Sequence, residues 1–329
     1  MDPAPFLRGV GFPGNERVPY PRVKPADAAR LPLDTWSCSR IPVGVRLELF
    51  GDAPEIEIAY RTETEELGYR GDGAGRKFAV WRDGRKVDQE KASLEDGTVR
   101  LSLGDRSDAR AIVYLPEGMK PTILDVRSVG GTIQPAPAQP KWVAYGDSVL
   151  EGWVASEPAL GWGHRAARDH GLDLVNMGYA GSARGEIASA EHVAELEADV
   201  ISITHGTNCW SRTPHSVGMF REGLRAFLDI VRAGHPNAPI VVASPVIRPD
   251  AETTPNKLGA SLGDLRVTME EVVWDRVANG DADLSLVPGG DLISEGQLAD
   301  GIHPNDDGHG AIAAALGPAI RSALDGGGT

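Results

Sequence analysis

Residues 143–152 read VAYGDSVLEG, and this stretch determines how the second half of the chain is interpreted. An apolar run ends at Gly-Asp-Ser, and a helix-compatible segment follows it. In a parallel α/β sheet, that order presents the hydroxyl of Ser148 at the carboxyl end of a strand, beside the positive end of a helix. Because these three residue types also form ordinary turns, the role of Ser148 depends on the rest of the chain.

Strand-like and helix-like segments alternate around and after this stretch. The apolar runs that predict strands are 142–145, 172–176, 199–204, 239–243 and 284–287. Between and after them, helical spacing covers 160–170, 186–196, 217–231, 265–277 and 311–320. This alternation predicts a parallel sheet covered by helices on both faces, and ligands bind such sheets at the carboxyl ends of the strands.

The chain upstream of this region has a different pattern, because its apolar residues recur with period two. Residues 41–129 contain short alternating runs that are separated by Gly- and Asp-rich turns, at 51–52, 71–73, 83–84, 96–97 and 104–105. The pattern predicts an all-β, jelly-roll-like antiparallel sandwich. We therefore divide the chain into a β-sandwich domain (1–130), a proline-rich linker (131–140) and an α/β domain (141–329).

Composition excludes several classes of partner. The net charge of −14 argues against nucleic acid and anionic membranes, and no apolar run is long enough to span a bilayer. Cys38 and Cys209 are expected to be free thiols, and the start of the chain does not resemble a secretory signal, so we expect a cytoplasmic protein. The excess of arginine (26) over lysine (7) suits a GC-rich bacterial genome.

Five candidate residues fall at predicted strand ends or in the last loop. Ser148 follows the first strand, Gly181 lies in the glycine-rich turn after the second, and Asn208 follows the third. Asp300 and His303 are three residues apart in a turn-like segment, so the carboxylate can orient the imidazole. Together they supply what acyl transfer needs: a nucleophile, an oriented base and donors for an oxyanion.

Each group also has a simpler interpretation. Gly181 could serve only the turn, and Asn208 could cap a helix. His303 could belong to a metal cluster or a solvated loop with nearby acidic residues and His309, although no second group of well-spaced ligands accompanies it, and we predict neither metal nor cofactor. Leu150 occupies the position where the α/β-hydrolase nucleophile elbow requires glycine, so that motif is excluded.

With these blocks in this order, the sequence resembles the GDSL, or SGNH, hydrolase family. The likeness spans residues 141–324. Residues 146–148 match the Gly-Asp-Ser block of the family. Gly181 matches the glycine of the second block, with Asn176 five residues before it. Gly206 and Asn208 match the third block, and residues 300–304 match the Asp-x-x-His-Pro block. Cys209 departs from the pattern, because the family has aspartate there. The departure puts the hydrogen bonding around Asn208 in question.

The resemblance implies a three-layer, flavodoxin-like α/β/α domain and a serine mechanism. Ser148 would attack an ester, His303 would take its proton, and Asp300 would fix the imidazole. The N–H groups of Ser148 and Gly181 and the Asn208 amide would form the oxyanion hole. A β-sandwich ahead of such a domain resembles two-domain carbohydrate esterases and GDSL-type acyltransferases that modify glycosylated polyketides.

We therefore predict an esterase that acts on a small acylated molecule, with a sugar or glycosylated natural product as one candidate. The alternatives are an O-acyltransferase to a sugar or polyketide hydroxyl and an inactive carbohydrate-binding protein. Trp153 and Trp210 are predicted to line the substrate pocket, although aromatic residues more often belong to the core. The sequence does not indicate the oligomeric state.

Overall fold

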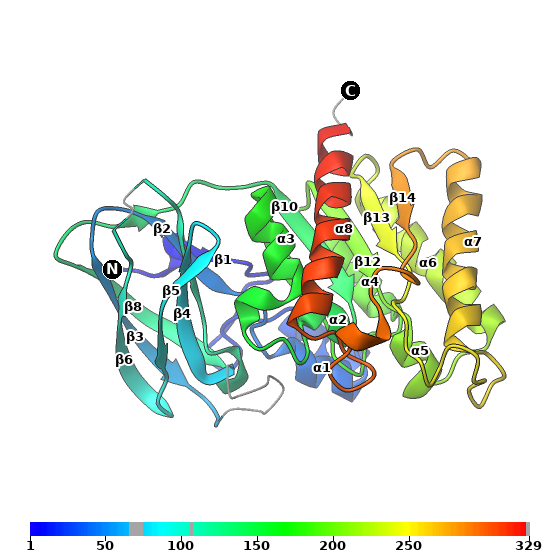
Figure 1. Cartoon of the computed structure of the whole chain (residues 1–329), viewed down its shortest axis with the longest axis horizontal. Coiled ribbons are helices and arrows are strands. Elements are labelled where there is room, and N and C mark those ends of the chain that lie inside the picture. The colour runs from blue at the N-terminus through cyan, green and yellow to red at the C-terminus, as the bar shows by residue number, and fades with distance from the viewer. Residues whose placement is uncertain (66–74, 106–107, 327–329) are drawn as a thin grey trace.

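The computed structural model describes residues 1–65, 75–105 and 108–326. An antiparallel β-sandwich lies beside a parallel α/β unit, with the sandwich on the left of Figure 1 and the α/β unit on the right. The fold class predicted from the sequence is confirmed. The predicted turn at 71–73 lies outside the described residues.

Two antiparallel sheets form the sandwich, with orders β1-β2-β7-β4-β5 and β6-β3-β8, and β9 pairs with β2. The strands of the first sheet are β1 (Leu7–Arg8), β2 (Arg46–Phe50), β7 (Ala111–Tyr114), β4 (Lys77–Arg82), β5 (Arg85–Lys91) and β9 (Gln134–Pro135). Those of the second are β6 (Glu95–Ser102), β3 (Glu55–Thr62) and β8 (Pro121–Val129). Alternate side chains such as Leu47, Ile58 and Leu101 are fully buried between the sheets, as the period-two pattern requires.

The α/β unit contains a five-stranded parallel sheet in the order β11-β10-β12-β13-β14. Its strands are β10 (Lys141–Gly146), β11 (Asp173–Gly178), β12 (Val200–Thr204), β13 (Ile240–Ala243) and β14 (Leu284–Val287). In chain order this is 2-1-3-4-5, the flavodoxin-like order that was expected. The chain reverses its direction of winding after β11, so the carboxyl ends of β10 and β12 flank the switch point where such sheets bind ligands.

Helices cover both faces of this sheet. One face carries α3 (Trp162–His170) and α8 (Asp306–Gly326), which pack through residues such as Trp162 and Ile312. The other carries α4 (Ile187–Glu195), α6 (Val217–Gly234) and α7 (Leu262–Ala278). Two short helices, α2 (Ser148–Glu151) and α5 (Thr207–Ser211), follow β10 and β12 directly. None of the described helices is long and apolar enough to cross a membrane.

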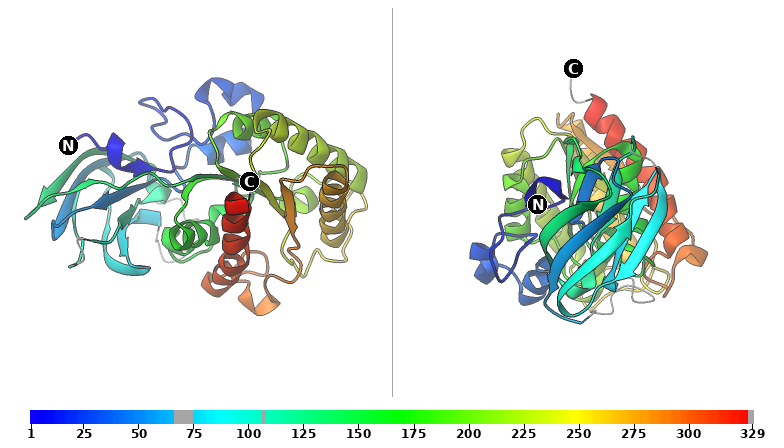
Figure 2. Two further views of the ribbon diagram at one scale, coloured as in Figure 1. Left: turned by 90° about the horizontal axis from the view of Figure 1, so that it is seen from above. Right: turned by 90° about the vertical axis from the view of Figure 1, so that its left-hand side faces the viewer.

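The segment between β1 and β2 leaves the sandwich and packs on the α/β unit. It carries α1 (Leu33–Ser39), and its residues Phe12, Val23 and Leu31 belong to the same buried cluster as the parallel strands. Figure 2 shows this blue segment beside the green helices. The predicted boundaries assign this segment to the sandwich domain, because nothing in its residue types shows which core its scattered apolar side chains join.

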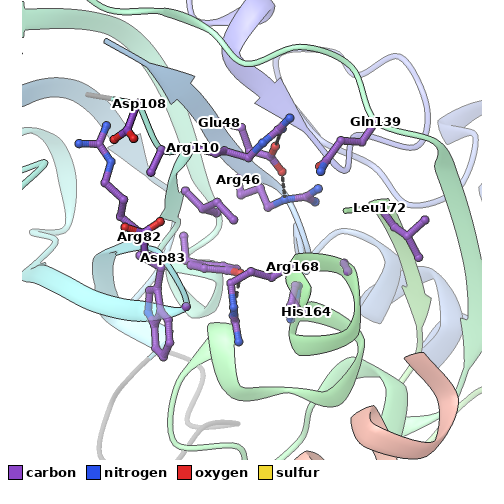
Figure 3. A pocket seen from close by; sticks show the side chains of 16 residues that line it. Arg46, Glu48, Arg82, Asp83, Asp108, Arg110, Gln139, His164, Arg168 and Leu172 are labelled. Atoms are coloured by element: carbon purple, nitrogen blue, oxygen red, sulfur yellow. Dashed lines mark hydrogen bonds and ion pairs between the residues drawn. The ribbon is translucent and has the colours of Figure 1, made fainter. Parts of the chain in front are cut away.

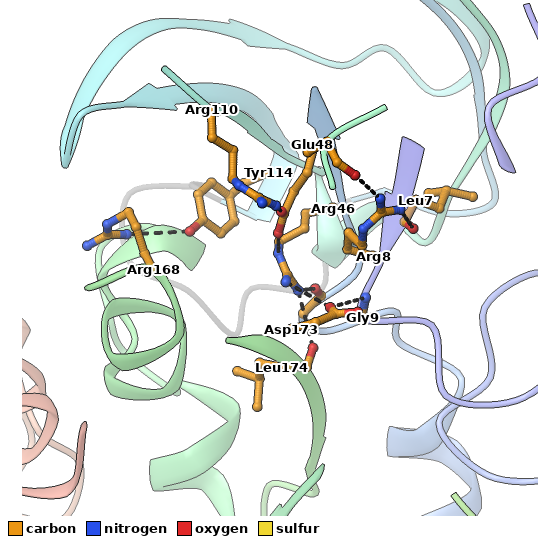
Figure 4. A network of polar contacts seen from close by, with 12 residues as sticks. Leu7, Arg8, Gly9, Arg46, Glu48, Arg110, Tyr114, Arg168, Asp173 and Leu174 are labelled. Atoms are coloured by element: carbon orange, nitrogen blue, oxygen red, sulfur yellow. Dashed lines mark hydrogen bonds and ion pairs between the residues drawn. The ribbon is translucent and has the colours of Figure 1, made fainter. Parts of the chain in front are cut away.

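A buried ionic network joins the sandwich to the start of β11 (Figure 4). Arg46 on β2 contacts the carboxylates of Glu48 (2.6 Å) and Asp173 (2.9 Å), and its Nη1 donates to the carbonyl oxygen of Leu174 (3.2 Å). Arg110 forms a second ion pair with Glu48. Burial acts to lower the pKa of the Arg46 guanidinium, but the two carboxylates outweigh it and raise that pKa. The network therefore holds its charges as satisfied pairs.

Candidate active site

Strand β10 leads directly into the nucleophile. Gly146 ends the strand where a side chain would collide, since a Cβ there would lie 2.4 Å from the Thr204 hydroxyl. Asp147 caps α2 and accepts the backbone N–H of Val149 (3.0 Å). Its carboxyl group is buried, and that burial raises its pKa to about 6. Ser148 is consequently the first residue of a short helix at the end of the strand.

Three side chains form a continuous chain of hydrogen bonds. Ser148 Oγ lies 3.0 Å from His303 Nε2, and His303 Nδ1 lies 2.8 Å from Asp300 Oδ2. The other carboxylate oxygen accepts the N–H groups of Ile302 (3.0 Å) and His303 (2.8 Å). Partial burial acts to raise the pKa of Asp300, but the hydrogen bonds from His303 and the backbone outweigh it and lower the pKa.

The ionised carboxylate fixes the tautomer of the imidazole. A carboxylate only accepts hydrogen bonds, so the Nδ1 proton of His303 points to Asp300. Nε2 is then left with its lone pair toward the hydroxyl of Ser148. This arrangement can take the serine proton as a nucleophile forms, as in a serine–histidine–aspartate triad.

The predicted oxyanion donors surround the same space. Gly181 has φ +69°, a left-handed conformation that glycine adopts without strain. Asn208 donates one amide hydrogen to the carbonyl oxygen of Ala183 (3.2 Å), and its second hydrogen remains for a ligand. Ser148, Gly181, Asn208 and His303 all line one cavity of about 410 Å³. Residues from three separate strand ends and the last loop thus meet at one point.

Asn176 supports this arrangement from behind. Its amide donates to the carbonyl oxygen of Leu150 (3.0 Å), and its side-chain oxygen accepts the N–H of Gly178 (2.8 Å). The buried side chain therefore ties α2, which begins with the nucleophile, to the strand end that precedes Gly181.

Cys209, the residue that departs from the family pattern, is fully buried. Its thiol points to the carbonyl oxygen of Arg184 (3.7 Å), and burial raises the pKa of this thiol well above its usual range. The loop after it is held by Asn256, whose amide donates to the carbonyl oxygen of His215 (2.9 Å). Other side chains thus hold the loop that follows Asn208.

The two tryptophans predicted for the pocket have different positions. Trp153 lines the cavity, and its ring centroid lies 6.0 Å from that of His303. Trp210 is not among the described residues that line it. Its ring instead lies under the guanidinium of Arg248 (4.8 Å), which does line the cavity.

Other parts of the cavity wall were not predicted. Cys38 and Ile41 come from the segment between β1 and β2, and Arg212 and Arg248 come from loops after α5 and β13. No local sequence pattern marks these residues, because only the fold brings them to Ser148.

A buried arginine holds the loop that carries Gly181. Arg22 donates through Nη1 to the carbonyl oxygens of Asn176 (3.3 Å) and Gly178, and through Nη2 to that of Cys38 (2.7 Å). Glu151, one helical turn after Ser148, accepts the N–H of Ala180 and lies 3.8 Å from Arg22. The side chains of Arg22 and Glu151 are each only 1% exposed. This pair therefore connects the nucleophile's helix to the turn that presents Gly181.

A second cavity of about 360 Å³ lies between the sandwich and α3 (Figure 3). It shares no lining residue with the catalytic cavity. Part of the charge on its wall is paired, because Glu48 forms ion pairs with both Arg46 and Arg110. The guanidinium of Arg168 lies over the Trp81 ring (4.8 Å). No group of three or more possible metal-ligating side chains occurs within the described ranges.

Comparison with known proteins identifies the family of the chain. The sequence model of the GDSL-like lipase/acylhydrolase family matches residues 144–311. The chain belongs to this family. No curated protein sequence matches it.

Similar solved structures extend over both halves of the chain. The salicylyl-acyltransferase SsfX3 from a tetracycline biosynthetic pathway is 25% identical, with a TM-score of 0.82 over 97% of this chain and 94% of its own. A GDSL-like lipase from Bacteroides ovatus is 21% identical, with a TM-score of 0.80 over 97% and 95%. A family two carbohydrate esterase from Clostridium thermocellum, solved with cellohexaose, is 17% identical, with a TM-score of 0.65 over 85% and 92%.

Proposed function

We propose that the protein is a serine esterase that acts through an acyl-enzyme on a small acylated molecule. The observation that carries the proposal is the Ser148–His303–Asp300 chain, with contacts of 3.0 and 2.8 Å, opening into a cavity. A sugar or a glycosylated natural product is the candidate carrier of the ester. The complete arrangement argues against an inactive carbohydrate-binding protein.

The geometry supports two half-reactions. Ser148 Oγ attacks the ester carbonyl carbon while its proton moves to His303 Nε2, and the carbonyl oxygen becomes an oxyanion. The N–H groups of Ser148 and Gly181 and the Asn208 amide stabilise this oxyanion. Collapse expels the alcohol, which takes the proton from His303. Water then loses a proton to His303 and attacks the acyl-enzyme, and His303 returns that proton to Ser148 Oγ as the bond to the acyl carbon breaks and the acid is released.

An O-acyltransferase is the second candidate. A hydroxyl of a sugar or polyketide would replace water in the second half-reaction, with the same residues in the same roles. The likeness to a salicylyl-acyltransferase over nearly the whole chain supports this alternative.

Labelling with a fluorophosphonate tests the nucleophile. We expect one adduct, mapped by mass spectrometry to Ser148, and none in Ser148→Ala. An unlabelled protein in which Ser148 is accessible would contradict the proposal.

A competition experiment separates hydrolysis from transfer. An aryl ester is supplied with increasing amounts of a sugar alcohol, and the products are separated by chromatography. Free acid alone at every acceptor concentration supports the esterase, whereas an acylated sugar alcohol that replaces the acid supports the transferase.

A further inference from the structure

The catalytic cavity has cationic groups on its wall although the whole chain is strongly acidic. Arg212 and Arg248 both line it, while the net charge of the chain is −14. The one carboxylate among its described lining residues is Glu151, which is buried and already bonded to the N–H of Ala180. The lining residues therefore present more positive than negative charge to a bound molecule.

Arg212 is placed beside the oxyanion site. Its guanidinium lies against Gly181, so that a Cβ at Gly181 would be 3.6 Å from Arg212 Nη2. Its side chain is exposed and makes no ion pair or side-chain hydrogen bond within the described part of the chain. A guanidinium carries five N–H donors in a planar fork that fits carboxylate and phosphate oxygens. Arg212 thus has its full donor set available at the place where a substrate would react.

Arg248 is different, because its position is fixed by neighbours. It contacts both carboxylate oxygens of Asp250 (2.8 and 3.1 Å) and lies over the Trp210 ring. Its side chain is only 11% exposed. Asp250 therefore offsets part of the charge of Arg248 and holds its guanidinium in place. Arg212 has no such carboxylate partner within the described residues.

We propose that the substrate carries an anionic oxygen group, a carboxylate or a phosphate, that Arg212 binds next to the oxyanion hole. The inference rests on the proposed function and specifies its substrate class. In an acidic protein, anions are repelled at long range, so a local pair of arginines favours an anion only where it docks. Binding in this position also aligns the ester with Ser148, which lowers the barrier to acylation.

Matched ester pairs test the proposal. On the acyl side, mono-para-nitrophenyl glutarate is compared with its neutral methyl ester. On the leaving-group side, para-acetoxybenzoate and para-acetoxyphenyl phosphate are compared with phenyl acetate. We expect kcat/KM to favour at least one anionic member by about tenfold, the size of a charge-assisted hydrogen bond at a partly exposed site. The preference should shrink as salt is added.

Variants assign the preference to Arg212. In Arg212→Gln the ratio of anionic to neutral kcat/KM should fall to about one, and Arg212→Lys should restore part of it by returning the charge. Arg321→Gln, the same change at an arginine on α8 that pairs with Asp325, should keep the wild-type ratio. A ratio near one for every pair in the wild type, or a ratio that survives in Arg212→Gln, overturns the proposal.

The two proposals fail in different ways. Turnover of the neutral esters that disappears in Ser148→Ala supports the esterase proposal, whatever the charge preference. If those esters are turned over without any anionic preference, only the assignment to Arg212 is wrong. If no ester is turned over and no fluorophosphonate adduct forms, the esterase proposal itself is wrong.

Discussion

The two ends of β11 are each held by a buried arginine from the first 46 residues, and the two arginines act in different surroundings. Arg46 binds the carbonyl oxygen of Leu174 near the start of the strand, and Arg22 binds those of Asn176 and Gly178 near its end. β11 is an edge strand, and alternate carbonyls point to its free side. Side chains from the first part of the chain thus bond to the backbone edge of the parallel sheet.

The pKa values of two buried carboxyl groups, Glu48 and Asp147, shift in opposite directions. At the start of β11, burial acts to raise the pKa of Glu48, but Arg46 and Arg110 outweigh it and lower that pKa. At the catalytic end, the buried carboxyl of Asp147 has a raised pKa of about 6. The arginines at the start of β11 therefore favour the ionised form of Glu48, whereas burial disfavours the ionised form of Asp147. The same kind of arginine–carbonyl hydrogen bond is thus expected to serve stability at the start of β11 and the geometry of the site at its end.

The largest expected effect is on kcat and follows from a change at Ser148, at the carboxyl end of the parallel sheet. Ser148→Ala should lower kcat by about 10⁴- to 10⁶-fold, because the nucleophile is lost. The thermal midpoint should stay close to that of the wild type, since a small hydroxyl is removed. Ester hydrolysis and a melting curve measure the two quantities, with Ser285→Ala on the exposed face of β14 as a control. Equal activity in both variants would remove Ser148 from the mechanism.

Arg22→Met should damage both activity and stability. Without the guanidinium, the carbonyl oxygens of Asn176 and Gly178 lose a donor and Glu151 loses its buried partner, which costs about 3–5 kcal/mol of unfolding free energy. Because the turn before Gly181 loses its support, kcat should also fall by about 10- to 100-fold. Denaturant unfolding and active-site titration separate the two effects.

Arg30→Met, at an exposed arginine of the same segment, serves as the control for Arg22. If Arg22→Met destabilises the protein but leaves kcat per active site unchanged, the two ends of β11 do not differ as described.

Arg46→Met should lower stability and leave the chemistry alone. Its loss removes the ion pair of the partly buried Asp173, although Arg110 still neutralises Glu48, so we expect about 3 kcal/mol of destabilisation. The kcat per titrated active site should stay within about twofold of the wild type, because the change lies at the opposite end of the strand. A tenfold loss of kcat would show that this end also positions the site.

The last prediction concerns the contribution of Asp147 to the pH dependence of the unfolding free energy. Its pKa is raised in the folded protein, so above the unfolded value of about 3.9 the unfolded chain releases a proton that the folded chain keeps. Stability from this group is therefore fully present below pH about 3.9 and is lost as pH rises to about 6, by up to about 3 kcal/mol. Asp147→Asn should lack this decline, as measured by denaturant unfolding from pH 4 to 7. Parallel curves for the two proteins would contradict the assignment.

The sequence predicts the parallel sheet, and with it the strand ends at which the candidate site residues meet, for a physical reason. Strands of a parallel sheet are buried on both faces, so each appears as a short apolar run, and the functional residues follow those runs directly. Ser148, Gly181 and Asn208 could therefore be found from local order alone. Strand β5 has no alternating apolar pattern, because its side chains are mostly exposed and polar, so the sequence does not predict it.

The supporting residues could not be predicted from local order. Arg22 is one of 26 arginines, and its contacts lie more than 150 residues away along the chain at Asn176 and Gly178. Cys38, Ile41 and Arg212 become cavity residues only when their segments fold over the site. Such long-range placement leaves no periodic signal in the sequence.

The hydrogen bonds from Arg22 and Arg46 to β11 also limit how this chain can be recombined with other proteins. A crossover at the proline-rich linker would pair the parallel sheet with a foreign front half, and three carbonyls of its edge strand would lose their donors. The bare edge could then pair with another chain, which is a route to aggregation. An exchange that keeps these three hydrogen bonds has to carry residues 1–46 together with β11.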